Sequence, residues 1–265
     1  MNKLHSRSVD PSSKVGNQKK RAGRTTALAF AATLLLAACA EKEVTPKHFD
    51  TFPQAKTALD KLATKYEQSN EVVNEKTVED IYETLAGALP KVKQQTKAWL
   101  TETTESRAGV YSYTDPDDNH EKTIVVSEDK FEDGSRIRDI TTTARFESGS
   151  RDTYLRIETD KAGRESISFN YSSFQDYSDG STGTSSKGTT FDGPEVSTYN
   201  DLDGDWQLSS HYTFDGQVFR GEREIPVEAD QVDYQASQLT EGVNLVTDYM
   251  NWIDAALVTA TPKPL

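Results

Sequence analysis

The spacing of the apolar residues changes near Ala108, and this change limits the fold more than any other feature of the chain. Before Ala108, apolar residues recur every three or four positions, as they do on one side of a helix. After it they alternate with polar residues, as in the segments 151–159 and 165–171. Such alternation is typical of strands with one buried face. The chain is therefore predicted to form helices first and an antiparallel meander second.

Asp-Gly pairs punctuate the alternating region and favour tight hairpin turns, because glycine readily adopts positive φ. They occur at 133–134, 179–180, 192–193, 203–204 and 215–216. We expect strands at about 108–114, 121–128, 135–146, 151–159, 165–171, 205–214 and 217–227. The best-defined hairpin joins Trp206–Phe214 to Gln217–Val227 through Asp215-Gly216. Residues 178–190 are nearly all Ser, Thr and Gly, which predicts a loop.

The region before the strands is predicted to be helical over 53–104. Thr51 followed by Gln54 has the pattern of a capping box, which marks a helix start. Gly87 and Pro90 are predicted to end or kink the second helix of this region. The periodicity then resumes, so either a third helix or a continuation of the second follows.

The region 239–258 has a broad apolar stripe, which predicts a C-terminal helix that must be covered. Packing against the sheet is the default, and a lid over a lipid-sized cavity or a face offered to a partner are the alternatives. The order of elements predicts an α+β fold: an antiparallel β-meander or curved sheet over 108–228, with the N-terminal helices and the C-terminal helix packed on one face. A single domain over 53–260 accommodates these elements.

The start of the chain is organised differently from the rest. A basic segment precedes an apolar run from Thr25 to Ala38, and Cys39, the only cysteine, follows Leu36-Ala37-Ala38. These residues resemble the signal peptide and lipobox of bacterial lipoproteins. The resemblance implies that residues 1–38 are removed, that the Cys39 thiol carries the lipid (diacylglyceryl, with acyl chains such as palmitate), and that residues 39–52 form a tether. An uncleaved membrane helix is the alternative, but the run is shorter than the ~20 apolar residues a span needs.

The negative net charge of the chain limits the classes of partner that it can bind. The net charge is −13, and the predicted leader holds seven of the 30 basic residues and one of the 43 acidic ones, so the mature part carries −19. This balance argues against nucleic acid as a partner, because nucleic-acid affinity depends on basic side chains. The negative charge also disfavours electrostatic adsorption to a bilayer of anionic lipids. Attachment to the membrane would therefore depend on the acyl chains at Cys39. We expect an extracytoplasmic protein anchored to the cell membrane, or to the outer membrane of a two-membrane envelope.

Metal and catalytic motifs are sparse. Asp201, Asp203 and Asp205 surround Gly204 and could offer oxygen ligands to calcium. The order differs from an EF-hand, so a solvated Asp-Gly turn is the alternative reading, and the acidic loop 115–119 is weaker still. No two histidines have a ligand spacing, and there is no Gly-x-Ser-x-Gly elbow or glycine-rich phosphate loop. We therefore assign no catalytic residue and no cofactor, and expect a protein that is not an enzyme.

The expected function is non-catalytic binding or an envelope-structural role. Phe174, Tyr177 and Tyr199 flank the Ser/Thr/Gly segment, where they could line a recognition surface for glycans or peptides or simply pack the loop. The alternative is a carrier of a lipid or amphiphile held between sheet and helices. In element order and lipidation alone, the chain is similar to the periplasmic lipoprotein carriers and the mycobacterial glycolipid-carrier lipoproteins. A hydrolase built from carboxylates without a motif is the third hypothesis.

Overall fold

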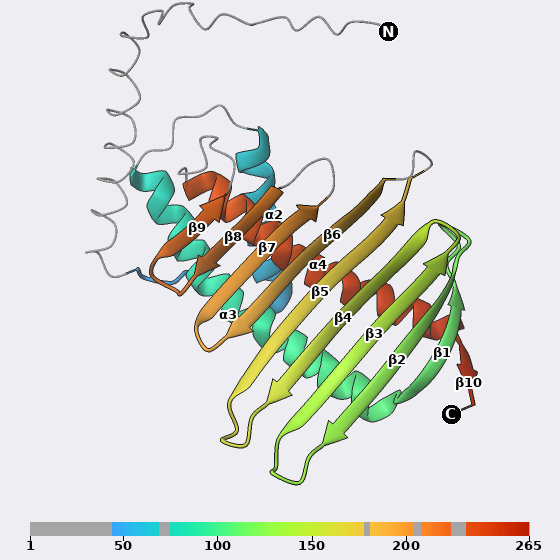
Figure 1. Ribbon diagram of the computed structural model, residues 1–265. Coiled ribbons are helices and arrows are strands. Elements are labelled where there is room, and N and C mark those ends of the chain that lie inside the picture. Colours follow the sequence, from blue (N-terminus) through green and yellow to red (C-terminus); the bar gives the residue numbers. More distant parts are fainter. Residues whose placement is uncertain (1–43, 69–74, 178–180, 204–207, 224–231, 265) are drawn as a thin grey trace, which may run out of the picture.

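The computed structural model describes residues 44–68, 75–177, 181–203, 208–223 and 232–264 (Figure 1). The described helices are α2 (Phe52–Gln68), α3 (Glu75–Ser106) and α4 (Val232–Thr259). The strands are β1 (Gly109–Thr114), β2 (Glu121–Lys130), β3 (Arg136–Phe146), β4 (Gly149–Thr159), β5 (Glu165–Asp176), β6 (Thr182–Asp192), β7 (Glu195–Asp203), β8 (Leu208–Phe214), β9 (Phe219–Arg223) and β10 (Thr261–Lys263). The predicted α+β class is confirmed.

The strands form one antiparallel sheet of ten members, in which β1 to β9 follow one another in sequence order. The exception is β10, which pairs with β1 and places the C-terminal strand at the edge opposite to β9. The hairpin predicted around Asp215-Gly216 is confirmed, with Phe214 opposite Phe219. The helices lie on one face of this sheet (Figure 1), as the order of elements predicts.

The core lies between the helices and the sheet, because successive strand residues point to opposite faces and most of the large apolar ones point toward the helices. The strands contribute Ile124, Ile140, Leu155, Ile167, Phe191 and Phe214, and the helices contribute Leu59, Ile81, Leu85, Leu100, Leu239 and Ile253, all almost fully buried. Helix α2 begins where the capping-box pattern predicts a helix start. The Gln54 side-chain oxygen accepts hydrogen bonds from the backbone amides of Asp50 (2.9 Å) and Thr51 (3.3 Å).

Helix α4 packs closely against the middle of the sheet. A Cβ atom at Gly242 would lie 2.4 Å from Thr198 and 2.8 Å from Thr189, so only glycine permits this approach. The Tyr249 hydroxyl shares a 2.8 Å hydrogen bond with Thr142 on β3. The cavity lined by α4 and strands β6 to β8 has a volume of about 20 Å³, which is enough for one water molecule. Helix and sheet are therefore in direct contact at this position.

The loop predicted over 178–190 is wrong for most of its length, because β6 begins at Thr182 and pairs with β5 and β7 on either side. Threonine is β-branched and fits a strand, and serine is tolerated where the strand has a solvated face. Pairing on both sides also satisfies the backbone groups of β6. The strand β7 was likewise not predicted, and residues 178–180 lie outside the described part.

The two long helices extend further than predicted. Helix α3 runs through Gly87 and Pro90 without ending, so its second half is the continuation rather than a third helix. Pro90 is exposed while Leu89 and Val92 are buried, so packing offsets the hydrogen bond lost at the proline. Helix α4 begins at Val232, before the predicted 239, because its apolar stripe starts there. None of the described helices has an apolar stretch long enough to cross a membrane.

Candidate functional site

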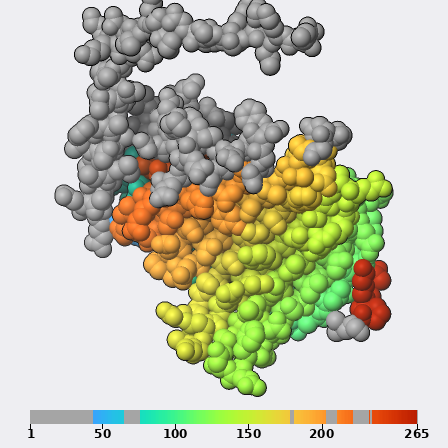
Figure 2. All heavy atoms as spheres, in the orientation of Figure 1, coloured from blue at the N-terminus to red at the C-terminus, as the bar shows by residue number. Residues whose placement is uncertain are grey.

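The face of the sheet opposite to the helices is polar and hydroxyl-rich. It is the face seen in Figure 2, where the colours of β2 to β7 follow one another from green to orange. Strand alternation gives it many serine and threonine side chains: Thr123, Thr141, Thr143, Ser150, Ser166, Ser168, Ser172, Ser186, Thr190, Ser197 and Thr213. We call it the open face, because the helices of the described part all lie on the other side.

One line of cross-strand neighbours on the open face combines aromatic and planar polar groups. Tyr154 on β4 lies opposite Asn170 on β5, which lies opposite Gly188 on β6. Gly188 in turn lies opposite Tyr199 on β7, and Tyr199 lies opposite His211 on β8. We call these five residues the open-face row. Because neighbouring strands are ~4.8 Å apart, the row spans about 19 Å across the sheet.

The ring of Tyr199 lies across the backbone of Gly188. A Cβ atom at position 188 would be 2.1 Å from this ring, so glycine is needed for the tyrosine to lie flat. The Tyr199 hydroxyl accepts a hydrogen bond from the Asn170 amide and another, of 3.3 Å, from Ser186. The ring is also nearly parallel to that of its cross-strand neighbour His211, with centroids 5.9 Å apart and planes 20° apart. Tyr199 is thereby held as a fixed, half-buried aromatic platform.

The opposite end of the row is held by an arginine. The Arg156 guanidinium lies 5.1 Å from the centroid of the Tyr154 ring and pairs with Asp139 (3.0 Å) and Glu158 (3.4 Å). Burial lowers the pKa of Arg156, but these two carboxylates outweigh it and raise that pKa. Burial, with a smaller effect of Tyr199, raises the pKa of Tyr154. The Tyr154 phenol therefore stays neutral and available as a donor at neutral pH.

The chemistry of the row is that of recognition. Arg156 beside the row is paired with two carboxylates, so its charge is compensated within the face, and His211 lies 3.5 Å from Asp201. The flat aromatic rings offer apolar surface, while the amide, imidazole and hydroxyl groups offer hydrogen bonds. Small-molecule sites are normally concave. A flat row of this length instead suits an extended ligand that crosses several strands.

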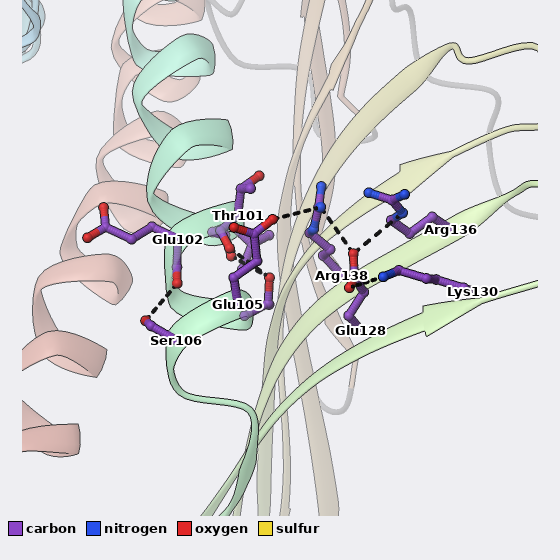
Figure 3. A network of polar contacts seen from close by, with 10 residues as sticks. Thr101, Glu102, Glu105, Ser106, Glu128, Lys130, Arg136 and Arg138 are labelled. Carbon is purple, nitrogen blue, oxygen red and sulfur yellow. Dashed lines mark hydrogen bonds and ion pairs between the residues drawn. The ribbon is translucent and has the colours of Figure 1, made fainter.

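A second feature lies along α3, where a hollow of about 650 Å³ is lined by Gln94, Lys97, Ala98, Thr101, Glu102, Glu105 and Ser106. Figure 3 shows that Glu105 of α3 reaches across to the β2–β3 hairpin, where Arg138 lies between it and Glu128. Arg138 is 3.3 Å from Glu105 and 3.0 Å from Glu128. Lys130 (3.0 Å) and Arg136 (3.4 Å) also pair with Glu128. This network ties the end of α3 to the sheet.

The Glu128 carboxylate is held ionised, which suits a structural role better than acid catalysis. Burial raises the pKa of Glu128, but Lys130, Arg138 and Arg136 outweigh it and keep the pKa below the ordinary 4.5. A depressed pKa in the folded state adds stability above the unfolded-state pKa, and this stability is lost as the pH falls through the folded-state pKa. The network should therefore weaken in acid.

We expect Glu128→Gln to flatten the acid limb of the stability profile. Between neutral pH and about pH 3, the free energy of unfolding should fall less steeply in the variant than in the wild type, because one depressed carboxylate no longer titrates. Urea titrations at a series of pH values measure this slope. Glu102→Gln is the matched control on α3, since Glu102 has no ion pair among the described residues and should leave the slope unchanged. Equal slopes in wild type and Glu128→Gln would contradict the role given to Glu128.

The residues predicted as sites fall partly outside the described residues. Cys39 and the leader lie there, as does Asp205, and nothing is described of the Asp203 side chain. Asp201 is on the open face of β7, where it pairs with His211. In the described part of the chain, no group of three or more His, Cys, Asp or Glu side chains could hold a metal ion.

The aromatic trio predicted to flank the Ser/Thr/Gly segment is divided between the two sides of the sheet. Tyr199 belongs to the open-face row, and Phe174 is on the same face of β5 with 40% of its surface exposed. Tyr177 is 49% exposed and lies over Gly183, which belongs to the helix-facing alternation of β6. Sequence reasoning missed Tyr154, Asn170 and Gly188 as site residues, since the row depends on the register of β6 and β7, which are not among the predicted strands.

No family model, curated protein or solved structure matches this chain. The assignment of a function therefore depends on the residues and their geometry.

Proposed function

We propose that this protein is a lipid-anchored extracytoplasmic binding protein whose open-face row binds an extended, uncharged glycan without catalysis. The observation that carries the proposal is the straight alignment of Tyr154, Asn170, Tyr199 and His211 across neighbouring strands. A sugar ring has a C–H face that packs on an aromatic ring, and a rim of hydroxyl groups that pair with planar polar side chains. The row supplies both kinds of contact from β4, β5, β7 and β8, and Gly188 on β6 leaves room for the Tyr199 ring.

The charge of the protein favours a neutral ligand over a charged one. The mature part, with a net charge of −19, repels polyanions, and Arg156 is already paired with Asp139 and Glu158. The hydroxyl-rich surroundings also differ from the apolar centre of a stable protein interface. An uncharged polymer with many hydroxyl groups is the class of ligand that fits both conditions.

The lipid anchor of the proposal is supported by the basic segment, the apolar run and the lipobox-like Leu36-Ala37-Ala38-Cys39. Two or more acyl chains on one cysteine give stable membrane attachment, at ~0.8 kcal/mol per buried methylene. Expression in a bacterial host should give a detergent-phase protein with a lipid mass on Cys39. Cys39→Ser should leave the protein unlipidated and in the aqueous phase. An aqueous wild-type protein would contradict the anchor.

The binding part of the proposal is tested by affinity electrophoresis through gels containing a neutral β-glucan, an α-mannan or a galactan. We expect at least one to retard the wild type, and Tyr199→Ala and Asn170→Ala to weaken the retardation tenfold or more. Tyr177→Ala is the matched control, because it removes an exposed tyrosine from the other side of the sheet and should keep wild-type retardation. Loss of binding in Tyr177→Ala but not in Tyr199→Ala, or no retardation in any gel, would contradict the assignment.

A further inference from the structure

The segment just after the predicted lipidation site is docked on the domain. The Lys47 amide donates a 2.9 Å hydrogen bond to the carbonyl of Glu83 on α3. The Lys47 ammonium donates to Asp80 and, at 2.8 Å, to Thr84 on the same helix. One turn further on, a Cβ atom at Gly87 would lie 2.0 Å from the Lys47 carbonyl oxygen. Glycine at this position therefore lets the segment lie directly on α3.

The same segment also touches the sheet. The Val44 amide donates a 3.2 Å hydrogen bond to the side chain of Gln217 in the β8–β9 turn, and the Val44 and Phe49 side chains pack against the core. Figure 1 draws this part in blue beside β8 and β9. We call residues 44–50 the docked segment. It begins at the β9 edge of the sheet, whereas β10 forms the other edge.

We infer that the docked segment holds the protein upright on the bilayer, with the β9 edge next to the lipid surface and the β10 edge away from it. The inference rests on the proposed lipidation of Cys39. From Cys39 to Val44 there are five residue steps, which span at most about 18 Å even when fully extended. The lipid surface must therefore lie within this distance of the corner formed by α3 and the β8–β9 turn.

Docking also determines which parts of the sheet lie near the membrane. Ten strands at ~4.8 Å place the β10 edge about 43 Å from the β9 edge. The plane of the sheet is then roughly perpendicular to the bilayer. The open face points parallel to the membrane surface and does not contact the lipid. A ligand on the open-face row would run from near the membrane outward, without competition from the lipid.

The orientation is tested by energy transfer in lipid nanodiscs that contain acceptor-labelled lipid. Lipidation consumes the thiol of Cys39, so one added cysteine carries the only donor dye. Arg220→Cys places it on the exposed side of β9, and Lys263→Cys places it on β10. We expect transfer to be at least severalfold more efficient from position 220 than from position 263. Equal efficiencies, or a higher one from 263, would overturn the inference.

Variants of the docked segment separate docking from anchoring. Gly87→Ala inserts a methyl group where the Lys47 carbonyl lies, and alanine favours the helix over glycine, so α3 should remain intact. We expect this variant to remain in the nanodisc but lose the difference between the two labels. Lys61→Ala, at an exposed lysine on α2, is the control that should keep it.

Hydrogen exchange of the unlipidated Cys39→Ser protein tests docking without the lipid. The Lys47 amide should be protected in this protein and should exchange at least tenfold faster after Gly87→Ala. An unprotected Lys47 amide would refute docking even if the protein is lipidated. Conversely, a protected amide in a chain that fails to enter nanodiscs would refute the anchor and leave the docked segment standing.

Discussion

Replacing Tyr249 with alanine is expected to lower the free energy of unfolding by about 4 kcal/mol, as for other large aromatic residues in cores. Tyr249 is 8% exposed and sits where α4 crosses the sheet. Its ring packs 5.6 Å from that of Phe169 and 6.1 Å from that of Trp252, between centroids, and its hydroxyl pairs with Thr142. Urea denaturation followed by circular dichroism measures the loss.

Tyr249→Phe provides the matched control for this prediction. It keeps the ring and removes only the hydroxyl, so it leaves Thr142 without its partner and should cost about 1 kcal/mol. Burial raises the pKa of the Tyr249 phenol, so the hydroxyl is neutral and its loss removes no charge. If alanine costs no more than phenylalanine at this position, the helix–sheet packing described here is wrong.

The second large effect is expected from Lys122→Met, which should destabilise the protein by about 3 kcal/mol at neutral pH. The Lys122 side chain is 14% exposed and pairs with Asp115, which is 7% exposed, and with Asp118 at 3.2 Å. Its ammonium also lies 5.2 Å from the Trp252 ring. Methionine fills the space but leaves the buried Asp115 carboxylate without its cation. Thermal and urea unfolding at pH 7 measure the difference.

Acid should reduce the effect of Lys122→Met. Burial raises the pKa of Asp115, but hydrogen bonds from Lys122 and the Asp117 amide outweigh it and lower that pKa in the wild type. This stabilisation is present above the unfolded-state pKa and is lost as the pH falls through the folded-state pKa. Wild type and variant should therefore converge only as the pH falls below the ordinary carboxyl pKa of 3.8. Lys130→Met, on the same strand but 65% exposed, should cost less than 1 kcal/mol at any pH.

The sequence alone predicts the elements whose two faces differ in polarity. In β4 and β5 apolar residues alternate with polar ones, and the stripe of α4 repeats at helical spacing, so their type and the α+β class can be derived from period alone. The Asp215-Gly216 turn likewise identifies its hairpin, because few residue pairs tolerate its backbone angles. These features are local and are visible in a short window of sequence.

The rest depends on contacts between distant residues. In β6 both faces are rich in Ser, Thr and Gly, so no alternation distinguishes it from a loop, and its strand form depends on β5 and β7 on either side. Helix α3 continues through Pro90 because the core residues on both sides of it are buried against other elements. The open-face row requires the register of five strands, so neither Asn170 nor Gly188 is distinctive in sequence.

The measurement that tests the central claim most directly is a footprint of the bound glycan on the folded protein. Amide and side-chain NMR signals of the unlipidated Cys39→Ser protein would be recorded with increasing amounts of whichever neutral polysaccharide retards it in gels. We predict that the largest shifts occur at Tyr154, Asn170, Tyr199 and His211, with little change at the α3 residues Thr101 and Glu105 that line the hollow. Shifts confined to the α3 hollow, or absent from the open-face row at saturating polysaccharide, would contradict this account.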